Sequence, residues 1–292
     1  MDLKNELKST DLVVKNNVLI EASYRLSLTE QRLILCGIVE ARESQRGLSG
    51  DTFATITAKR YVELFPDSSL DSAYHMLKDA CDSLMRRQVT LGGIDEATGN
   101  PCIDKIQWVS RARYVPRSAL IRLRFSEEIA PLITRLEKEF TFYRLELVSK
   151  LTSIYAIRIY ELLLQYRDIG ERPFNLDELK HILGLNLTDY NGRTGVSDFK
   201  KRVIDIAMKQ INEHTDICVD YQNIKDGRSV IGILFTIKAK PEPKKSATAP
   251  KPIKLPDSVT APTTRTDSAT VKDARAAALT AARSGKGRTA AN

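Results

Sequence analysis

A short run of cations offers the clearest chemistry in the sequence. Lys200, Lys201 and Arg202 are consecutive, and Lys209 and Asn212 follow them at helical spacing. The apolar residues of the same stretch recur on the opposite side of such a helix: Phe199, Val203, Ile206, Ala207 and Ile211. A helix in the major groove of DNA presents cations to phosphates and to the acceptor atoms of guanine. Residues 196–212 therefore predict a DNA-reading helix, with an ordinary solvated helix face as the alternative.

The position of these cations within the helix bears on that choice. Ser197 or Asp198 is expected to cap the helix, because short polar side chains accept hydrogen bonds from its first N–H groups. The cations at 200–202 then lie near the helix start, where the macrodipole favours anions. Helix stability does not explain their position, and this favours DNA contact.

Two further groups of cations lie in stretches with the composition of β-hairpins. The turn sequence Lys-Asp-Gly-Arg at 225–228 separates two β-rich segments, so Lys225 and Arg228 are expected at a hairpin tip. Arg111 and Arg113 belong to a similar basic region. The same region also contains Arg117, Arg122 and Arg124. Both groups are predicted to contact DNA, by lying on phosphates or in the minor groove.

A second candidate DNA-facing helix, at 71–87, has a mixed exposed face. His75 and Lys78 lie beside Asp79 and Asp82 at helical spacing. Mixed signs favour contact with phosphates or with protein over reading of bases. His75 and Lys78 are therefore predicted as positioning contacts, and a solvated histidine is the alternative for His75.

These candidate residues fall into elements that occur twice in the same order. The first copy comprises a helix at 26–42, a strand at 52–57, helices at 58–65 and 71–87, and strands at 88–91 and 121–125. The second comprises a helix at 151–167, a strand at 173–176, helices at 177–185 and 196–214, and strands at 217–221 and 230–237. Helix, strand, helix, helix, strand, strand is the order of a winged helix. We therefore expect an α+β protein with two tandem winged-helix domains, at 1–145 and 146–239.

The charge of the chain is concentrated in its C-terminal tail. The net charge is +8, but residues 240–292 contain eleven Lys and Arg against four Asp and Glu, which leaves 34 against 33 for the remainder. The tail is rich in Pro, Ala and Lys and has too few apolar residues to form a core, so it is predicted to be disordered. It either adds nonspecific attraction to phosphates or is a solubilising extension.

Catalysis, cofactors and membrane insertion find no support in the sequence. No phosphate-binding loop of the G-x-x-x-x-G-K-[ST] type occurs, and the three histidines are isolated, so neither an ATPase nor a metal-dependent rolling-circle nickase is indicated. Cys36, Cys81, Cys102 and Cys218 are scattered, which predicts buried thiols rather than a zinc site or disulfides. No long apolar run or signal peptide is present, so we expect a cytoplasmic protein without a cofactor, a metal or a membrane partner.

The sequence also resembles a known family, the iteron-binding plasmid replication initiators of the F-factor type. The resemblance covers roughly residues 15–238 and is carried by the segments 26–32, 140–145 and 151–167. Residues 198–202, Asp-Phe-Lys-Lys-Arg, are similar to a D-F-R-R-R stretch in the DNA-reading helix of that family. Lys200 and Lys201 replace two arginines, which keeps the attraction to phosphate but loses bidentate contact with guanine. Base reading is therefore expected mainly from Arg202.

The resemblance implies a division of labour between the two copies. The C-terminal winged helix is expected to bind the direct repeats of a plasmid origin as a monomer and to promote origin opening. The N-terminal one is expected to support a dimer that binds an operator inverted repeat and represses the protein's own promoter. The resemblance also implies contacts with a host initiator, the replicative helicase and chaperones. We expect a bacterial DNA-binding protein, not an enzyme.

Two points stay open at the level of sequence. A winged-helix transcriptional regulator without initiator activity is the main alternative function. For the dimer, the strand at 121–125 is the expected interface, because an edge strand there can pair across a twofold axis.

Overall fold

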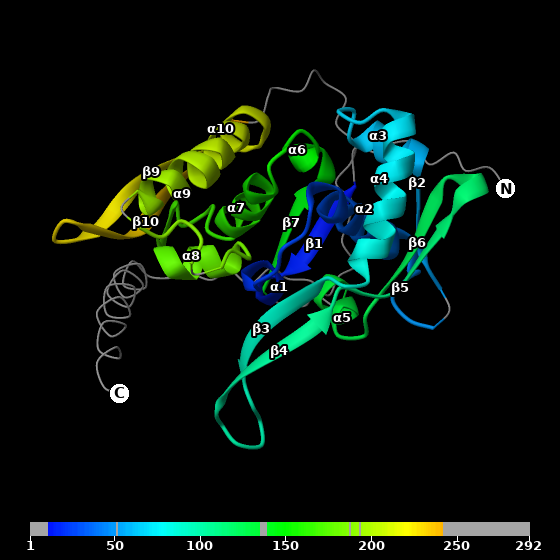
Figure 1. Ribbon diagram of the computed structural model, residues 1–292, viewed down its shortest axis with the longest axis horizontal. Helices are drawn as coiled ribbons and strands as arrows, with labels where there is room; N and C mark the ends of the chain where they lie inside the picture. The colour runs from blue at the N-terminus through cyan, green and yellow to red at the C-terminus, as the bar shows by residue number, and fades with distance from the viewer. Residues whose placement is uncertain (1–10, 51, 135–138, 187, 193, 242–292) are drawn as a thin grey trace.

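The computed structural model describes residues 11–50, 52–134, 139–186, 188–192 and 194–241. Figure 1 shows two lobes side by side, one around helices α2 and α4 and the other around helices α7 and α10. Strands β1 and β7 lie between the lobes, and one continuous set of buried apolar residues extends through both.

The first lobe has the predicted order of elements. It comprises α2 (Leu28–Ser44), β2 (Ala54–Thr57), α3 (Ala58–Leu64), α4 (Leu70–Leu84), β5 (Val109–Val115) and β6 (Leu120–Phe125). Helix α2 starts where it does because Ser27 and Glu30 form a reciprocal capping box. The three strands form an antiparallel sheet in the order β2-β6-β5, and the hairpin β5–β6 is the wing of the first winged helix.

The second lobe repeats this arrangement. It comprises α7 (Ile154–Leu164), β8 (Glu171–Asn175), α8 (Leu176–Ile182), a DNA-facing helix over residues 195–214, β9 (Ile217–Asp226) and β10 (Ser229–Ala239). Its sheet order, β8-β10-β9, is equivalent to that of the first lobe. The prediction of two tandem winged helices in an α+β protein is confirmed.

One hairpin of the first lobe was assigned incorrectly from the sequence. Strand β3 (Gln88–Ile94) pairs along its whole length with β4 (Pro101–Gln107), so it is not the first strand of the wing. Because the wing strand is β5, the hairpin β3–β4 is an insertion between the DNA-facing helix α4 and the wing. Figure 1 shows it projecting away from the rest of the lobe.

The predicted dimer edge is also wrong. Strand β6 is the central strand of its sheet, since it pairs with β2 on one side and with β5 on the other. Leu123, in the middle of β6, is fully buried. Both sets of main-chain hydrogen-bonding groups are therefore used within the sheet, and β6 cannot pair with a second copy of the chain.

The N-terminal strand joins the two lobes. Strand β1 (Leu12–Asn16) pairs antiparallel with β7 (Phe140–Arg144), and helix α1 (Asn17–Glu21) follows it. Two short helices flank β7 in the chain, α5 (Ile129–Thr134) and α6 (Leu145–Ser149). This small sheet leads directly into the first helix of the second lobe.

Buried charges hold the lobes together. The ammonium of Lys15 in β1 donates to the Glu161 carboxylate in α7 at 2.7 Å, and both side chains are almost completely buried. Tyr143 donates to the same carboxylate at 2.6 Å. Arg158, one turn before Glu161, donates to the carbonyl oxygens of Ile20 and Ala22 in the first lobe. The junction is therefore a hydrogen-bonded polar network inside an apolar core, which fixes the lobes relative to each other.

The basic tail lies outside the described residues, apart from its first two. The ammonium of Lys240 donates to the carbonyl oxygens of Asn212 and Thr215 and so holds the end of β10 against the helix before it. The division of the chain at 145 and 239 stays a prediction.

Candidate nucleic-acid interface

The DNA-facing helix of the second lobe consists of α9 (Gly195–Phe199), a π-helical segment (Lys200–Ile204) and α10 (Asp205–His214). Its start is set by Gly195, because a Cβ there would lie 1.9 Å from the carbonyl oxygen of Tyr190. Thr194 is the N-cap residue, so the prediction of Ser197 or Asp198 as cap is wrong. The cations consequently begin in the second turn, where the macrodipole has little effect, and that argument for DNA contact does not hold.

The geometry nevertheless exposes the cations. Lys201, Arg202 and Lys209 project into solvent, whereas Val203 and Ile204 are buried. Among the described residues, none of these three cations has an ion-pair partner. A π-helical turn is an uncommon local geometry that is frequent at functional sites. Here the π-helical segment carries Lys200, Lys201 and Arg202.

Tyr221 in β9 connects this helix to the wing, and no sequence pattern predicted this contact. The ammonium of Lys200 lies 5.1 Å from the Tyr221 ring centroid, and the Tyr221 hydroxyl donates to Asp205 at 2.8 Å. Burial and the adjacent Asp205 carboxylate raise the pKa of Tyr221 to about 12. The hydroxyl therefore stays protonated at neutral pH and holds the Asp205 carboxylate on this helix face.

Asn212 has a different role from the one predicted. Its amide oxygen accepts from the Val219 N–H at 2.6 Å, and its amide nitrogen donates to the Val219 carbonyl at 2.9 Å. The side chain is half-buried. Asn212 thus joins the helix to the start of β9, and we do not include it among the candidate DNA contacts.

The second-lobe wing is a long hairpin with cations at its end. The last paired residues are Asp226 and Ser229, so Gly227 and Arg228 form the turn. Gly227 has a φ of 57°, which a two-residue turn of this kind requires and which glycine adopts without strain. Lys225 and Arg228 are exposed, and Figure 1 shows the tip of the hairpin extending well beyond α9 and α10.

The equivalent helix of the first lobe, α4, also exposes its candidate residues. His75 and Lys78 project into solvent, as do the acidic Asp79 and Asp82. Tyr74, on the same helix, donates to the Pro116 carbonyl at the wing turn at 3.0 Å. The helix and wing of the first lobe therefore form one surface of mixed charge.

Arg111 and Arg113 lie in the wing hairpin of the first lobe, in the basic region that the sequence predicted. They lie along β5 and project from the sheet, with their guanidinium carbons 5.4 Å and 5.2 Å from the Phe53 ring centroid. The wing turn itself is a 3-10 turn (Pro116–Ser118) with Arg117 exposed. The prediction of a basic hairpin is correct, and Arg111 and Arg113 lie on one face of its sheet.

The cysteines of the protein are all free. Cys36 and Cys81 are buried, and burial raises the pKa of Cys36 to about 12 and that of Cys81 to about 11. Cys102 is half-buried and Cys218 is exposed, so the prediction of buried thiols is wrong for these two. Among the described residues, no group of three or more His, Cys, Asp or Glu side chains is placed to hold a metal ion. The described helices include none that is long and apolar enough to span a membrane.

Several known proteins are similar to this chain. An Escherichia coli protein, described as an uncharacterized 27.6 kDa protein, is 26% identical over 234 residues, which are 76% of this chain and 93% of that protein. The Pi initiator protein, solved in complex with iteron DNA, is 21% identical and superposes with a TM-score of 0.66 over 81% of this chain and 100% of its own. The WH1 domain of MSBI1.176, a replication protein isolated from a multiple sclerosis patient, is 36% identical, with a TM-score of 0.32 over 38% of this chain and 81% of the domain.

Family models match each winged helix separately. The model described as Initiator Replication protein, WH1, matches residues 12–164, and the model described as Initiator Rep protein, WH2, matches residues 175–237. Since the first match alone covers more than half of the chain, the protein belongs to the initiator replication protein family.

Proposed function

We propose that this protein initiates plasmid replication by binding direct repeats at the origin and promoting its opening. One observation carries the proposal. The second lobe exposes cations without ion-pair partners, among the described residues, on the two elements that a winged helix applies to a duplex. These are Lys201, Arg202 and Lys209 on the helix, and Lys225 and Arg228 on the wing tip. The similarity to the Pi initiator protein, whose structure holds iteron DNA, supports the choice of ligand.

The two lobes have different tasks in this proposal. Arg202 reads guanine in the major groove, because its guanidinium can donate two parallel hydrogen bonds to O6 and N7. Lys200, Lys201 and Lys209 contact phosphates as point charges. In the first lobe, His75 and Lys78 hold phosphates only, because Asp79 and Asp82 beside them disfavour deep entry into the groove.

The buried junction allows both lobes to act on one DNA site. Arg158 and the Lys15–Glu161 pair link the lobes through buried hydrogen bonds. A rigid connection means that binding of one lobe orients the other without further loss of freedom. A monomer can therefore bind one repeat with both helices, and the distortion of DNA that this requires promotes opening.

We infer that autorepression depends on a dimer, and that β4 is the strand through which it forms. Among the described residues, β4 pairs only with β3, so its other edge is unpaired. A twofold axis between Asp104 and Lys105 would place each Asp104 opposite Lys105 of a second copy. Ile103, which is 72% exposed, would be opposite Ile106 of that copy. Strand β4 is therefore self-complementary in charge and in apolar contact.

The decisive experiment for this function is replication of a minimal plasmid. A plasmid with this coding sequence, its flanking repeats and a selectable marker should replicate in a host that lacks another source of the initiator. Replacement of the repeats with a scrambled sequence should abolish replication. A protein that represses a promoter through these repeats but does not support replication would be a transcriptional regulator instead. Contacts with a host initiator, the replicative helicase and chaperones stay predictions.

A further inference from the structure

Ile206 lies on the exposed face of the DNA-facing helix, where the sequence did not predict it. Its spacing with Phe199, Val203 and Ile211 predicted a place on the packed side of an α-helix. In the structure the residue is 44% exposed, and within the described residues it is not part of the continuous apolar core. The prediction of Ile206 as a packing residue is therefore wrong.

The π-helical segment before Ile206 explains its position. Hydrogen bonds in a π-helix close one residue later than in an α-helix, so the segment Lys200–Ile204 holds one residue more than an α-helical turn. Because each residue of an α-helix turns the chain by about 100°, the extra residue rotates those that follow it by about this angle. The rotation brings Ala207 and Met208 to the core and Ile206 to the solvent.

Ile206 lies at the centre of the surface that this helix presents to DNA. Arg202 precedes it by four residues and Lys209 follows it by three, and residues at these spacings are neighbours on a helix surface. Both cations are exposed. The acidic Asp205 beside Ile206 accepts a hydrogen bond from the Tyr221 hydroxyl at 2.8 Å. An apolar side chain therefore lies between two proposed DNA contacts.

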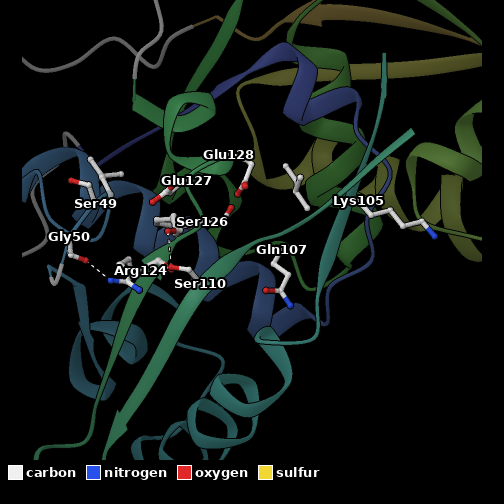
Figure 2. A pocket seen from close by; sticks show the side chains of 12 residues that line it. Ser49, Gly50, Lys105, Gln107, Ser110, Arg124, Ser126, Glu127 and Glu128 are labelled. Carbon is white, nitrogen blue, oxygen red and sulfur yellow. Dashed lines mark hydrogen bonds between the residues drawn. The ribbon is translucent and has the colours of Figure 1, made fainter. Parts of the chain in front are cut away.

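Position, rather than exposure, distinguishes Ile206 from other exposed side chains. Single apolar residues are common on protein surfaces, so exposure alone does not indicate a ligand. Figure 2 shows Arg124 beside the cavity between the hairpin β3–β4 and the segment after β6, where it donates to the Gly50 carbonyl and to the Ser110 hydroxyl. That guanidinium is engaged within the protein. Ile206 instead projects from the helix that a protein of this fold inserts into the major groove.

The equivalent helix of the first lobe has no such residue at its centre. Helix α4 is described over its whole length, and its exposed residues after Leu70 are all polar: Asp71, Ser72, His75, Lys78, Asp79 and Asp82. The exposed apolar side chain is therefore confined to the helix that we propose to read bases.

We propose that Ile206 contacts the methyl group of a thymine in the direct repeats and contributes to their recognition. In the major groove, thymine presents a methyl group that apolar side chains recognise by contact. Ile206 follows Arg202 by about 6 Å along the helix. Base pairs are about 3.4 Å apart, so this thymine lies within about two base pairs of the guanine that Arg202 reads. The inference rests on the proposed binding of direct repeats and names a base group that is recognised there.

The test is equilibrium binding of the full chain to duplexes of the flanking repeats in which thymines are replaced, one at a time, with deoxyuridine. Deoxyuridine lacks only the methyl group. At one position, wild type should bind the deoxyuridine duplex about fourfold more weakly, which is the effect of losing one methyl group from an apolar contact. Ile206→Ala should bind both duplexes equally, because its side chain no longer reaches the methyl group. Ile206→Val keeps the branched side chain and should retain most of the difference.

A matched control makes the result specific. Ile169 is 42% exposed in the turn after α7, outside the DNA-facing helix and the wing, so Ile169→Ala should keep the wild-type ratio. A fourfold difference that persists in Ile206→Ala would overturn the proposal, because the methyl dependence would then come from another residue or from DNA shape. Equal binding of every deoxyuridine duplex by wild type would overturn it as well. Wild type that does not prefer the repeats to random duplex would contradict the proposed function itself, and this inference with it.

Discussion

The two winged helices share one order of elements and one sheet order, but their charged residues lie on different surfaces. In the second lobe, exposed cations gather on the DNA-facing helix and the wing tip, as Arg202 and Arg228 illustrate. In the first lobe, the helix is mixed in charge, and the arginines lie along the outer sheet face. The comparison teaches that core positions determine the fold, while a small number of surface positions determine what each copy can bind.

The lobes also differ in the partners of their buried charged residues. Each first helix buries a glutamate. In α2, Glu30 accepts from Arg87 of the same lobe. In α7, Glu161 accepts from Lys15 of β1, the strand that joins the two lobes. The first arrangement stabilises one lobe, whereas the second makes each lobe depend on the other.

The largest effect is expected at this junction. Glu161→Gln leaves the ammonium of Lys15 and the guanidinium of Arg158 buried without a counter-charge, and loss of one partner from such a pair costs about 3–5 kcal/mol. Urea unfolding followed by circular dichroism measures the change. Glu146→Gln, in an exposed pair with Arg144, is the matched control and should change stability by less than about 1 kcal/mol. Equal effects of the two substitutions would mean that the junction does not couple the lobes.

The same carboxylate predicts an acid-sensitive junction. Burial raises the pKa of Glu161, but Lys15 and Arg158 lower it more, so its pKa lies below the ordinary value of 4.5. A lowered pKa means that the contribution to stability is complete above pH 4.5 and is lost as the pH falls through the pKa of the folded state. Wild type should therefore lose unfolding free energy steeply below pH 4.5, and Glu161→Gln should show a flatter profile. Identical slopes would exclude Glu161 as the cause.

An intermediate effect is expected for Asn212. Asn212→Ala leaves the buried main-chain groups of Val219 without partners, which costs about 1–3 kcal/mol. Discrimination between repeat and random DNA should be unchanged, because Asn212 is not a proposed contact. Asn223→Ala, at an exposed position on the same strand, is the control. A selective loss of repeat binding by a stable Asn212→Ala protein would mean that Asn212 contacts DNA after all.

A smaller effect is expected for a single phosphate contact. Lys209→Ala should weaken binding to repeat and random duplex equally and should reduce the salt slope by about 0.9. Lys238→Ala, which lies on the outer sheet face, should leave both affinities unchanged. Sequence-selective weakening by Lys209→Ala would contradict its assignment to phosphate.

The sequence predicted most of the helices and strands because apolar residues recur at periods that identify each element. It also located the exposed cations of the second lobe, since Lys201 and Arg202 alternate with buried residues at helical spacing. What it missed depends on contacts between distant segments. Lys15 and Glu161 are 146 positions apart, and nothing local indicates that they meet.

Other errors came from features that depend on strand register. The sequence assigned β3 to the wing, but β3 pairs with β4, and the first wing strand is β5. The sequence also assigned β6 to a dimer interface, but β6 is a central strand and has no unpaired edge. The role of Asn212 depends on the position of Val219 in β9, seven residues later. Residue types alone identify a polar side chain, but only the packed structure shows whether it faces a ligand or its own backbone.

The central claim is that the second lobe reads sequence and the first lobe holds phosphates. The most direct test compares Arg202→Ala with Lys78→Ala, two substitutions on equivalent helices, by titration against repeat and random duplexes at one salt concentration. Arg202→Ala should weaken repeat binding by about 1–3 kcal/mol more than random binding, because a base contact is lost. Lys78→Ala should weaken both duplexes equally. A selective loss for Lys78→Ala, together with a uniform loss for Arg202→Ala, would contradict the account.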